Sequence, residues 1–153
     1  MDIICQTSAE TEKIGRLLGL HAQNGDVFCL SGDLGAGKTL LCRGLAVAQG
    51  VDSAAVTSPT FTLMNVYKGR QLELRHFDLY RLNRQEELQD IGFDEYAGGE
   101  GITMIEWADL FPADLPEAYL QITITLIPEG RKITLLPVGK RYEELLKEAI
   151  VPC

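Results

Sequence analysis

The stretch VFCLSGDLGAGKT, residues 27–39, decides the fold. It begins with four apolar residues, Val27–Leu30, which are typical of a strand buried on both faces of a parallel sheet. Residues 32–39 match the pattern G-x-x-x-x-G-K-[ST] in full, and an apolar segment from about Gly37 to Gln49 predicts a helix directly afterwards. Strand, glycine-rich loop and helix in this order predict a loop that holds phosphate groups.

The residue types in this loop suit that chemistry. Glycines let the backbone curl so that successive N–H groups point inward, beside the positive end of the following helix. We expect Lys38 to place its charge on the β- and γ-phosphates, and Thr39 to give its hydroxyl to Mg²⁺. The expected nucleotide contacts are Asp33, Leu34, Gly35, Ala36, Gly37, Lys38, Thr39 and Leu40.

Such a loop needs a second acid, usually at the end of a buried strand. Two positions qualify, Glu106 after the run 102–105 and Asp78 after the less uniformly apolar run 74–77. A carboxylate there can bind Mg²⁺ through water or orient the water that attacks the γ-phosphate, and both positions remain candidates. The guanine-reading motif N-K-x-D is absent from the chain, which favours ATP over GTP.

The remaining patterns predict an α/β protein. Thr7 and Glu10 fit a capping box at the start of a helix that ends near residues 24–26. Further predicted elements are strands at 61–67, 72–78, 119–127 and 132–136, a short helix within 85–96 broken near Gly92, and a closing helix at 140–150. We therefore predict a P-loop NTPase-type three-layer fold with a mixed, partly parallel sheet, in a single domain spanning residues 1–153.

The charge excludes some classes of function. The 153 residues carry 22 acids and 14 bases, a net charge of −8, so bulk electrostatics would not hold this protein on nucleic acid. Between Arg84 and Arg131 there are eleven acids and no Lys or Arg, which is either a solvated face or a docking surface for a basic partner.

Two further expectations concern the compartment. No apolar run is long enough to span a bilayer, so we expect a cytoplasmic protein. The four cysteines form no C-x-x-C pair, and Cys29 and Cys42 are expected to be small core residues.

Four blocks in order resemble the TsaE (YjeE) family, bacterial P-loop ATPases of tRNA threonylcarbamoyladenosine (t6A) synthesis. They are GDLGAGKT at 32–39, SPTFTL at 58–63, HFDLYRL at 76–82 with EEL at 86–88, and IEWAD at 105–109. The resemblance implies an accessory protein that binds and hydrolyses ATP with Mg²⁺, slowly and under partner stimulation. Its implied partners are TsaD, which performs the transfer, and TsaB, so that any contact with tRNA is indirect.

The resemblance also implies roles for particular residues. Lys38, Asp78 and Glu106 would be catalytic, with Thr39 and Glu106 on the Mg²⁺ side. The loop Ser58–Thr62 would be switch-like. Further implied nucleotide contacts are Thr60 in that loop, which would sense the γ-phosphate, Trp107 near the nucleotide, and Ser8 or Thr11 together with Arg131 at the adenine. From the residues alone, Trp107 could equally be a core or interface aromatic.

Two other functions stay open at this point. A small-molecule kinase also uses this loop, but it usually has a lid with several arginines, and residues 85–129 contain none. A non-catalytic module is the other, in which ATP only orders the segment 58–63 for docking.

Overall fold

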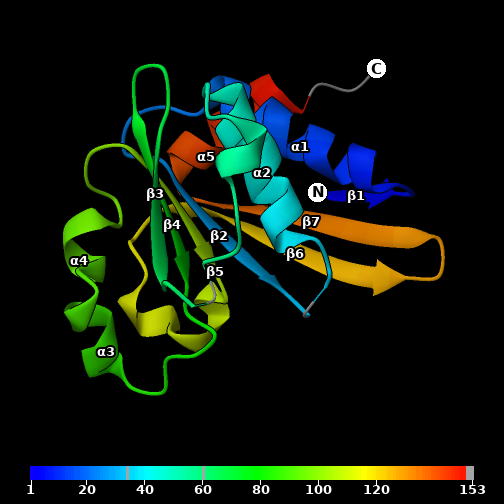
Figure 1. Cartoon of the computed structure of the whole chain (residues 1–153). Coiled ribbons are helices and arrows are strands. Elements are labelled where there is room, and N and C mark those ends of the chain that lie inside the picture. The colour runs from blue at the N-terminus through cyan, green and yellow to red at the C-terminus, as the bar shows by residue number, and fades with distance from the viewer. Residues whose placement is uncertain (34, 60, 151–153) are drawn as a thin grey trace.

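The computed structural model describes residues 1–33, 35–59 and 61–150. Its strands form one sheet in the order β1-β7-β6-β2-β5-β4-β3, with helices on both faces (Figure 1). The strands are β1 (Asp2–Cys5), β2 (Val27–Gly32), β3 (Met64–Lys68), β4 (Glu73–Asp78), β5 (Ile102–Glu106), β6 (Tyr119–Ile127) and β7 (Gly130–Val138). The helices are α1 (Ser8–His21), α2 (Lys38–Ala48), α3 (Gln85–Asp90), α4 (Phe93–Tyr96) and α5 (Lys140–Ala149), with short 3₁₀ turns at Ser53–Ala55, Ala108–Leu110 and Pro112–Asp114.

The sheet is mixed, as predicted. Its centre is parallel, because β2 pairs with β5 and β6, and β4 pairs with β5, all in parallel register. Both sides end in antiparallel pairs, β3 with β4 at one edge and β6, β7 and β1 at the other. The carboxyl ends of β2, β4 and β5 therefore lie side by side, and ligands of open α/β folds bind just beyond such strand ends.

Alternating side chains of the central strands enter two separate apolar layers. In β2, Phe28 and Leu30 pack in the layer under α1, α2 and α5, whereas Val27 and Cys29 pack in the layer under α3 and α4. These four side chains are at most 1% exposed. Burial on both faces explains why the strand is a continuous apolar run, and it makes the fold three-layered.

Helices α1 and α2 pack unusually closely in the first of these layers. A Cβ atom added to Gly15 would lie 2.1 Å from the carbonyl oxygen of Leu41, and one added to Gly44 would lie 2.1 Å from that of Glu12. Glycine is thus required on both helices, and their contact fixes the position of α2, whose first turn carries Lys38 and Thr39.

The predicted elements are all present, with shifted ends. The segment 61–67 becomes a strand only from Met64, and the short helix is interrupted at Gly92, which adopts φ 72°. Strand β1 was not predicted, because four residues at the chain start offer little pattern and it is held by its pairing with β7. Cys29 and Cys42 are core residues as expected, whereas Cys153 lies outside the described residues.

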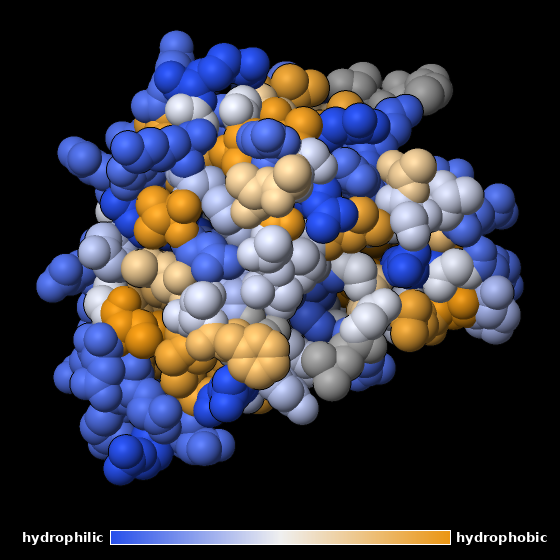
Figure 2. All heavy atoms as spheres, in the orientation of Figure 1, coloured by the Kyte–Doolittle hydropathy of each residue, from blue (hydrophilic) through white to orange (hydrophobic). Residues whose placement is uncertain are grey.

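The surface is mainly polar. Figure 2 shows charged and polar residues over much of one face, with apolar residues in smaller groups between them. Of the eleven acids between Arg84 and Arg131, eight are exposed and Glu87 and Asp114 are half-buried, so Glu106 alone is buried. Within the described residues, no helix combines the length and apolar character that crossing a bilayer requires.

Candidate functional site

The loop between β2 and α2 has a backbone that only glycine adopts readily. Gly35 has φ 78° and Gly37, which precedes the first residue of α2, has φ 111°. A Cβ atom on Gly35 would meet nothing within 4 Å, so the loop is open there. One on Gly37 would lie 3.2 Å from Nε of Arg131, which places that arginine directly beside the loop.

The ammonium group of Lys38 lies inside the loop. Its Nζ donates to the carbonyl oxygens of Gly32 at 2.5 Å and Asp33 at 3.0 Å, and it lies 4.1 Å from the centre of the Trp107 ring. Burial lowers the pKa of Lys38, although the nearby carboxylates, first Glu106, act in the opposite direction. The loop therefore holds a cation between carbonyl oxygens and an aromatic face.

Trp107 reaches this position through an uncommon backbone conformation. Its φ of 61° is left-handed, which costs a non-glycine residue on the order of 1 kcal/mol, and its N–H donates to the carbonyl oxygen of Leu30 at 2.9 Å. Strain of this kind is often retained where a side chain must be aimed at a functional site.

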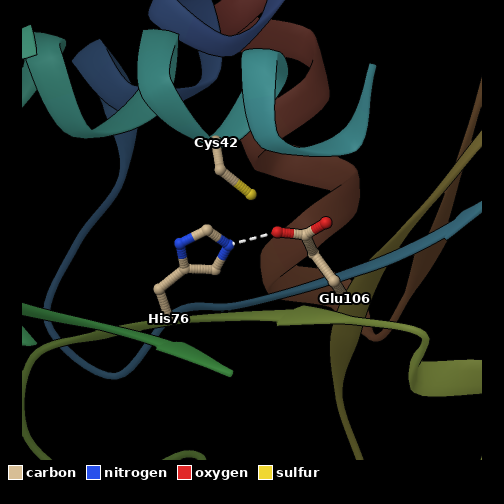
Figure 3. A group of neighbouring side chains, drawn as sticks. All are labelled: Cys42, His76 and Glu106. Carbon is tan, nitrogen blue, oxygen red and sulfur yellow. Dashed lines mark hydrogen bonds and ion pairs between the residues drawn. The ribbon is translucent and has the colours of Figure 1, made fainter. Parts of the chain in front are cut away.

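Glu106 is the last residue of β5 and is 3% exposed. Its carboxylate accepts from the Thr39 hydroxyl, with Oγ1 at 3.1 Å from Oε2 and 3.3 Å from Oε1. Its Oε2 also lies 2.5 Å from Nε2 of His76 (Figure 3). The carboxylate is thus oriented from two sides, by the first turn of α2 and by the neighbouring strand β4.

His76 is completely buried and hydrogen-bonded at both nitrogens. Its Nδ1 lies 3.1 Å from the hydroxyl of Tyr67 on β3, and that hydroxyl lies 3.0 Å from the carbonyl oxygen of Thr57. His76 is therefore a hydrogen-bonded structural histidine between β3 and β5.

Cys42 points from α2 toward the pair of His76 and Glu106 (Figure 3). One ligand atom from each of these three residues lies within 4.8 Å of the others, the spacing of a possible metal site. Burial raises the pKa of the Cys42 thiol well above its usual value, and the two other ligand atoms are already joined by a hydrogen bond. The arrangement therefore favours a packed thiol over a metal ligand.

Asp78 lies beside Glu106, because the two residues are register partners at the ends of β4 and β5. Its side chain is 3% exposed, and its Oδ1 accepts from the backbone N–H of Tyr80 at 2.9 Å. A cavity of about 290 Å³ opens in front of both carboxylates. Its lining comes from Gly35, Gly37, Lys38, Thr39, Leu40, Ser58, Asp78, Glu106, Trp107 and Arg131.

Most residues expected at the site are thus brought together. Of the remainder, Asp33 contributes its carbonyl oxygen to Lys38, and Ala36 is fully buried. Leu34 and Thr60 lie outside the described residues.

Two of the residues expected at the adenine, Ser8 and Thr11, lie outside the cavity lining. Ser8 is exposed at the start of α1, and Thr11 is buried with its hydroxyl 3.5 Å from the carbonyl oxygen of Thr7, so neither lines the cavity. The start of α1 is nevertheless near the loop, because Cys5 pairs with Arg131 across β1 and β7.

Sequence patterns missed three contributors, namely Tyr67, Ser58 as a cavity-lining residue, and Cys42 as a neighbour of Glu106. Tyr67 meets His76 because β3 and β4 pair with a register that no local pattern reveals. The SPTFTL block did point to the Ser58 segment, without showing that its first side chain lines the cavity.

The parallel core, the loop of residues 32–39 and the carboxylates at neighbouring strand ends define a P-loop NTPase-type α/β protein. Comparison with known proteins then gives the family. The model of the family "Threonylcarbamoyl adenosine biosynthesis protein TsaE" matches residues 5–133. The chain belongs to the TsaE family.

Named relatives agree. The protein is 44% identical over 140 residues to tRNA threonylcarbamoyladenosine biosynthesis protein TsaE of Bacillus subtilis, covering 91% of this chain and 87% of that one. It is 39% identical over 136 residues to the protein of the same name in Treponema pallidum, covering 88% and 99% of the two chains. A crystal structure of YdiB from Bacillus subtilis superposes with a TM-score of 0.78 and 37% identity, covering 97% of this chain and 91% of YdiB.

Proposed function

We propose that this protein is an ATP-binding and ATP-hydrolysing accessory protein of tRNA t6A modification, acting with TsaD and TsaB in the cytoplasm. The observation that carries the proposal is the contact of Thr39 with Glu106 at the mouth of an intact phosphate-binding loop. Family membership supports the pathway, because relatives are named for t6A biosynthesis.

The residues present fit a nucleoside triphosphate. Lys38 already lies among the acceptors of the loop, and a phosphate would replace the carbonyl oxygens of Gly32 and Asp33 as its partner. Nε of Arg131 is buried without a hydrogen-bond partner among the described residues, and it lies beside Gly37. A buried unpaired donor beside a phosphate-binding loop suits an anionic or polar ligand.

Thr39 and Glu106 fit Mg²⁺, since hydroxyl and carboxylate oxygens are the ligands that this ion prefers. When bound, Mg²⁺ would neutralise charge on the β- and γ-phosphates. Asp78 lines the cavity beside Glu106, and its Oδ1 accepts from the Tyr80 N–H. With Glu106 on the Mg²⁺ side, Asp78 would orient the attacking water. Thr60 would sense the γ-phosphate from the segment that begins at Ser58.

The base would lie outside the main cavity, because about 290 Å³ is at the lower limit for a ligand pocket. Arg131 and the start of α1, with Ser8 or Thr11, are neighbours through the pairing of β1 and β7, and they would contact the adenine there. Trp107 would support the nucleotide from the other side of Lys38.

The exposed acids between Arg84 and Arg131 would face a protein partner or solvent, so that any contact with tRNA is indirect. The test is tRNA binding by the isolated protein at physiological salt. Tight binding there, with a steep dependence on salt, would contradict this part of the proposal.

The central experiment measures ATP turnover with and without TsaB and TsaD. We expect slow turnover alone, stimulation by the partners, and loss of turnover in Lys38→Ala and Glu106→Gln. Exposed Lys68→Ala and Glu144→Gln are the matched controls and should behave like the parent protein. Normal turnover in either site variant would refute the assigned roles.

The same assay separates the two other functions. Phosphate transferred to an acceptor rather than to water would indicate a kinase. Full support of TsaB–TsaD over many turnovers by a non-hydrolysable ATP analogue would indicate a docking module without catalysis.

A further inference from the structure

An unbroken chain of hydrogen bonds joins Thr57, the residue before the SPTFTL block, to the carboxylate of Glu106. It runs from the carbonyl oxygen of Thr57 through the hydroxyl of Tyr67 and the ring of His76 to Glu106, and from there to the hydroxyl of Thr39. Its ends are two residues that border the nucleotide cavity, since Thr57 directly precedes Ser58.

The chemistry of the partners sets the direction of these bonds. The Thr57 carbonyl can only accept, so the single hydroxyl proton of Tyr67 is donated to it. The tyrosine oxygen also lies 3.1 Å from Nδ1 of His76, whose Nε2 faces Glu106. The imidazole is therefore held from both sides, in one ring orientation facing Glu106.

Burial makes the chain rigid. His76 is 0% exposed, Glu106 3% and Tyr67 6%, so water cannot readily take over a lost contact. The three side chains come from the adjacent strands β4, β5 and β3, whose register fixes their spacing.

Thr57 is tied to β3 at a second point. Nδ2 of Asn65 lies 3.3 Å from the Thr57 carbonyl oxygen, and Oδ1 of Asn65 accepts from the hydroxyl of Thr62 at 2.7 Å. Residues 57 and 62 are thus both anchored to the strand that carries Tyr67. A shift of this segment would act on Tyr67, and through it on His76.

We propose that Tyr67 and His76 are positioning residues that couple Thr57 and Thr62 to the orientation of Glu106. Neither touches the nucleotide, since neither lines the cavity. His76 aims the carboxylate at the Mg²⁺ position beside Thr39, and Tyr67 fixes the ring of His76 according to where the segment lies. The inference rests on the proposed binding of Mg²⁺ and ATP.

Paired variants separate the two links. In His76→Asn the amide can still reach the Tyr67 side but leaves Glu106 without this partner, whereas in His76→Gln the longer amide can reach Glu106. Tyr67→Phe keeps the ring and removes the hydroxyl, and with it the contacts with Thr57 and with His76. Tyr142→Phe is the matched control, because Tyr142 is also a buried tyrosine, hydrogen-bonded to the Val27 N–H away from the cavity.

The measurement is the affinity for a fluorescent non-hydrolysable ATP analogue with and without Mg²⁺, and the ratio of the two. Loss of an outer contact to a metal-side ligand typically weakens metal-dependent binding about tenfold or more. We therefore expect His76→Asn to lower the ratio about tenfold, His76→Gln to restore most of it, and Tyr67→Phe to lower it in the same direction. Affinity without Mg²⁺ should not change, and Tyr142→Phe should lower only the melting temperature.

Equal ratios in the parent protein, Tyr67→Phe and His76→Asn would overturn the inference, as would an equal loss in Tyr142→Phe. If His76→Asn does not fold, Tyr67→Phe and His76→Gln decide by the same criteria. An analogue that fails to bind the parent protein would refute the proposed function, and this inference with it. Binding that gains normally from Mg²⁺ in every variant would refute the inference alone.

Discussion

The close packing of α1 against α2 predicts the effect of replacing Gly44 in α2 by alanine. Helix propensity alone favours the change by about 1 kcal/mol, because glycine is a poor helix former. The structure predicts the opposite sign. The new Cβ would lie 2.1 Å from the carbonyl oxygen of Glu12, below the 3.0 Å that real Cβ contacts respect.

The magnitude follows from what can move. The opposing atom is backbone, so no side-chain rotation relieves the overlap, and the helices must separate by about 0.9 Å to restore 3.0 Å. Overpacking typically costs about 1–3 kcal/mol, and a backbone clash belongs at the upper end of that range. After the gain in propensity, we expect Gly44→Ala to lower the free energy of unfolding by about 2 kcal/mol.

Chemical denaturation measures this quantity, and the melting temperature should fall by about 4–8 °C. The difference between Lys13→Ala and Lys13→Gly, at an exposed position of α1, gives the propensity term in this protein. Affinity for an ATP analogue should also fall, because the displaced helix carries Lys38 and Thr39. An unchanged or increased stability of Gly44→Ala would refute the reasoning.

Three further outcomes are expected. Arg141→Met should lower the free energy of unfolding by about 2 kcal/mol, because it leaves the buried carboxylate of Asp26 without its ion-pair partner. The loss is smaller than for a fully buried pair, since the Arg141 side chain is 25% exposed. ATP turnover should not change. Denaturation and turnover assays check this, and Asp26→Asn combined with Arg141→Met should recover part of the loss. Gly37→Ala should weaken analogue binding about tenfold, because φ 111° is strained for alanine by about 1–2 kcal/mol; unchanged affinity by titration would contradict it. Burial raises the pKa of Cys29 to about 12, so at pH 8 about one thiol in ten thousand would be ionised. Labelling of Cys29 should therefore be slow in the native state, faster as pH rises toward that pKa, and complete in denaturant. The assay uses a Cys153→Ser background, which removes the cysteine outside the described range, and rapid native labelling of Cys29, located by mass spectrometry, would contradict the burial.

The parts of the fold that could be predicted are those whose residues form a recognisable local sequence pattern. The run 27–30, the glycine-rich loop and the apolar run 102–105 each report burial on both faces through continuous apolar sequence, and the structure contains all three. Strand β1 was missed because its four residues carry no such pattern. It forms because residues 131–134 of β7 offer an edge to pair with.

The candidate site likewise contains some residues that could be predicted from the sequence and others that could not. Lys38, Thr39 and the strand-end acids could be predicted, because the loop and the carboxyl ends of parallel strands must meet at one edge of the sheet. The contact of His76 with Tyr67 depends on pairing register between β3 and β4, and it could not be read from the sequence.

The two strand-end acids could not be told apart from the sequence, yet their neighbours differ. The carboxylate of Glu106 accepts from Thr39, the residue expected to ligate the ion, and it is held by His76. That of Asp78 accepts a backbone N–H from Tyr80. A ligand must present its oxygen where the other ligand of the same ion already is, and the carboxylate of Glu106 does so through its contact with Thr39. The geometry therefore favours Glu106 on the Mg²⁺ side and leaves Asp78 to the water, so Asp78→Asn should lower turnover while keeping the Mg²⁺-dependent gain in nucleotide affinity that Glu106→Gln loses.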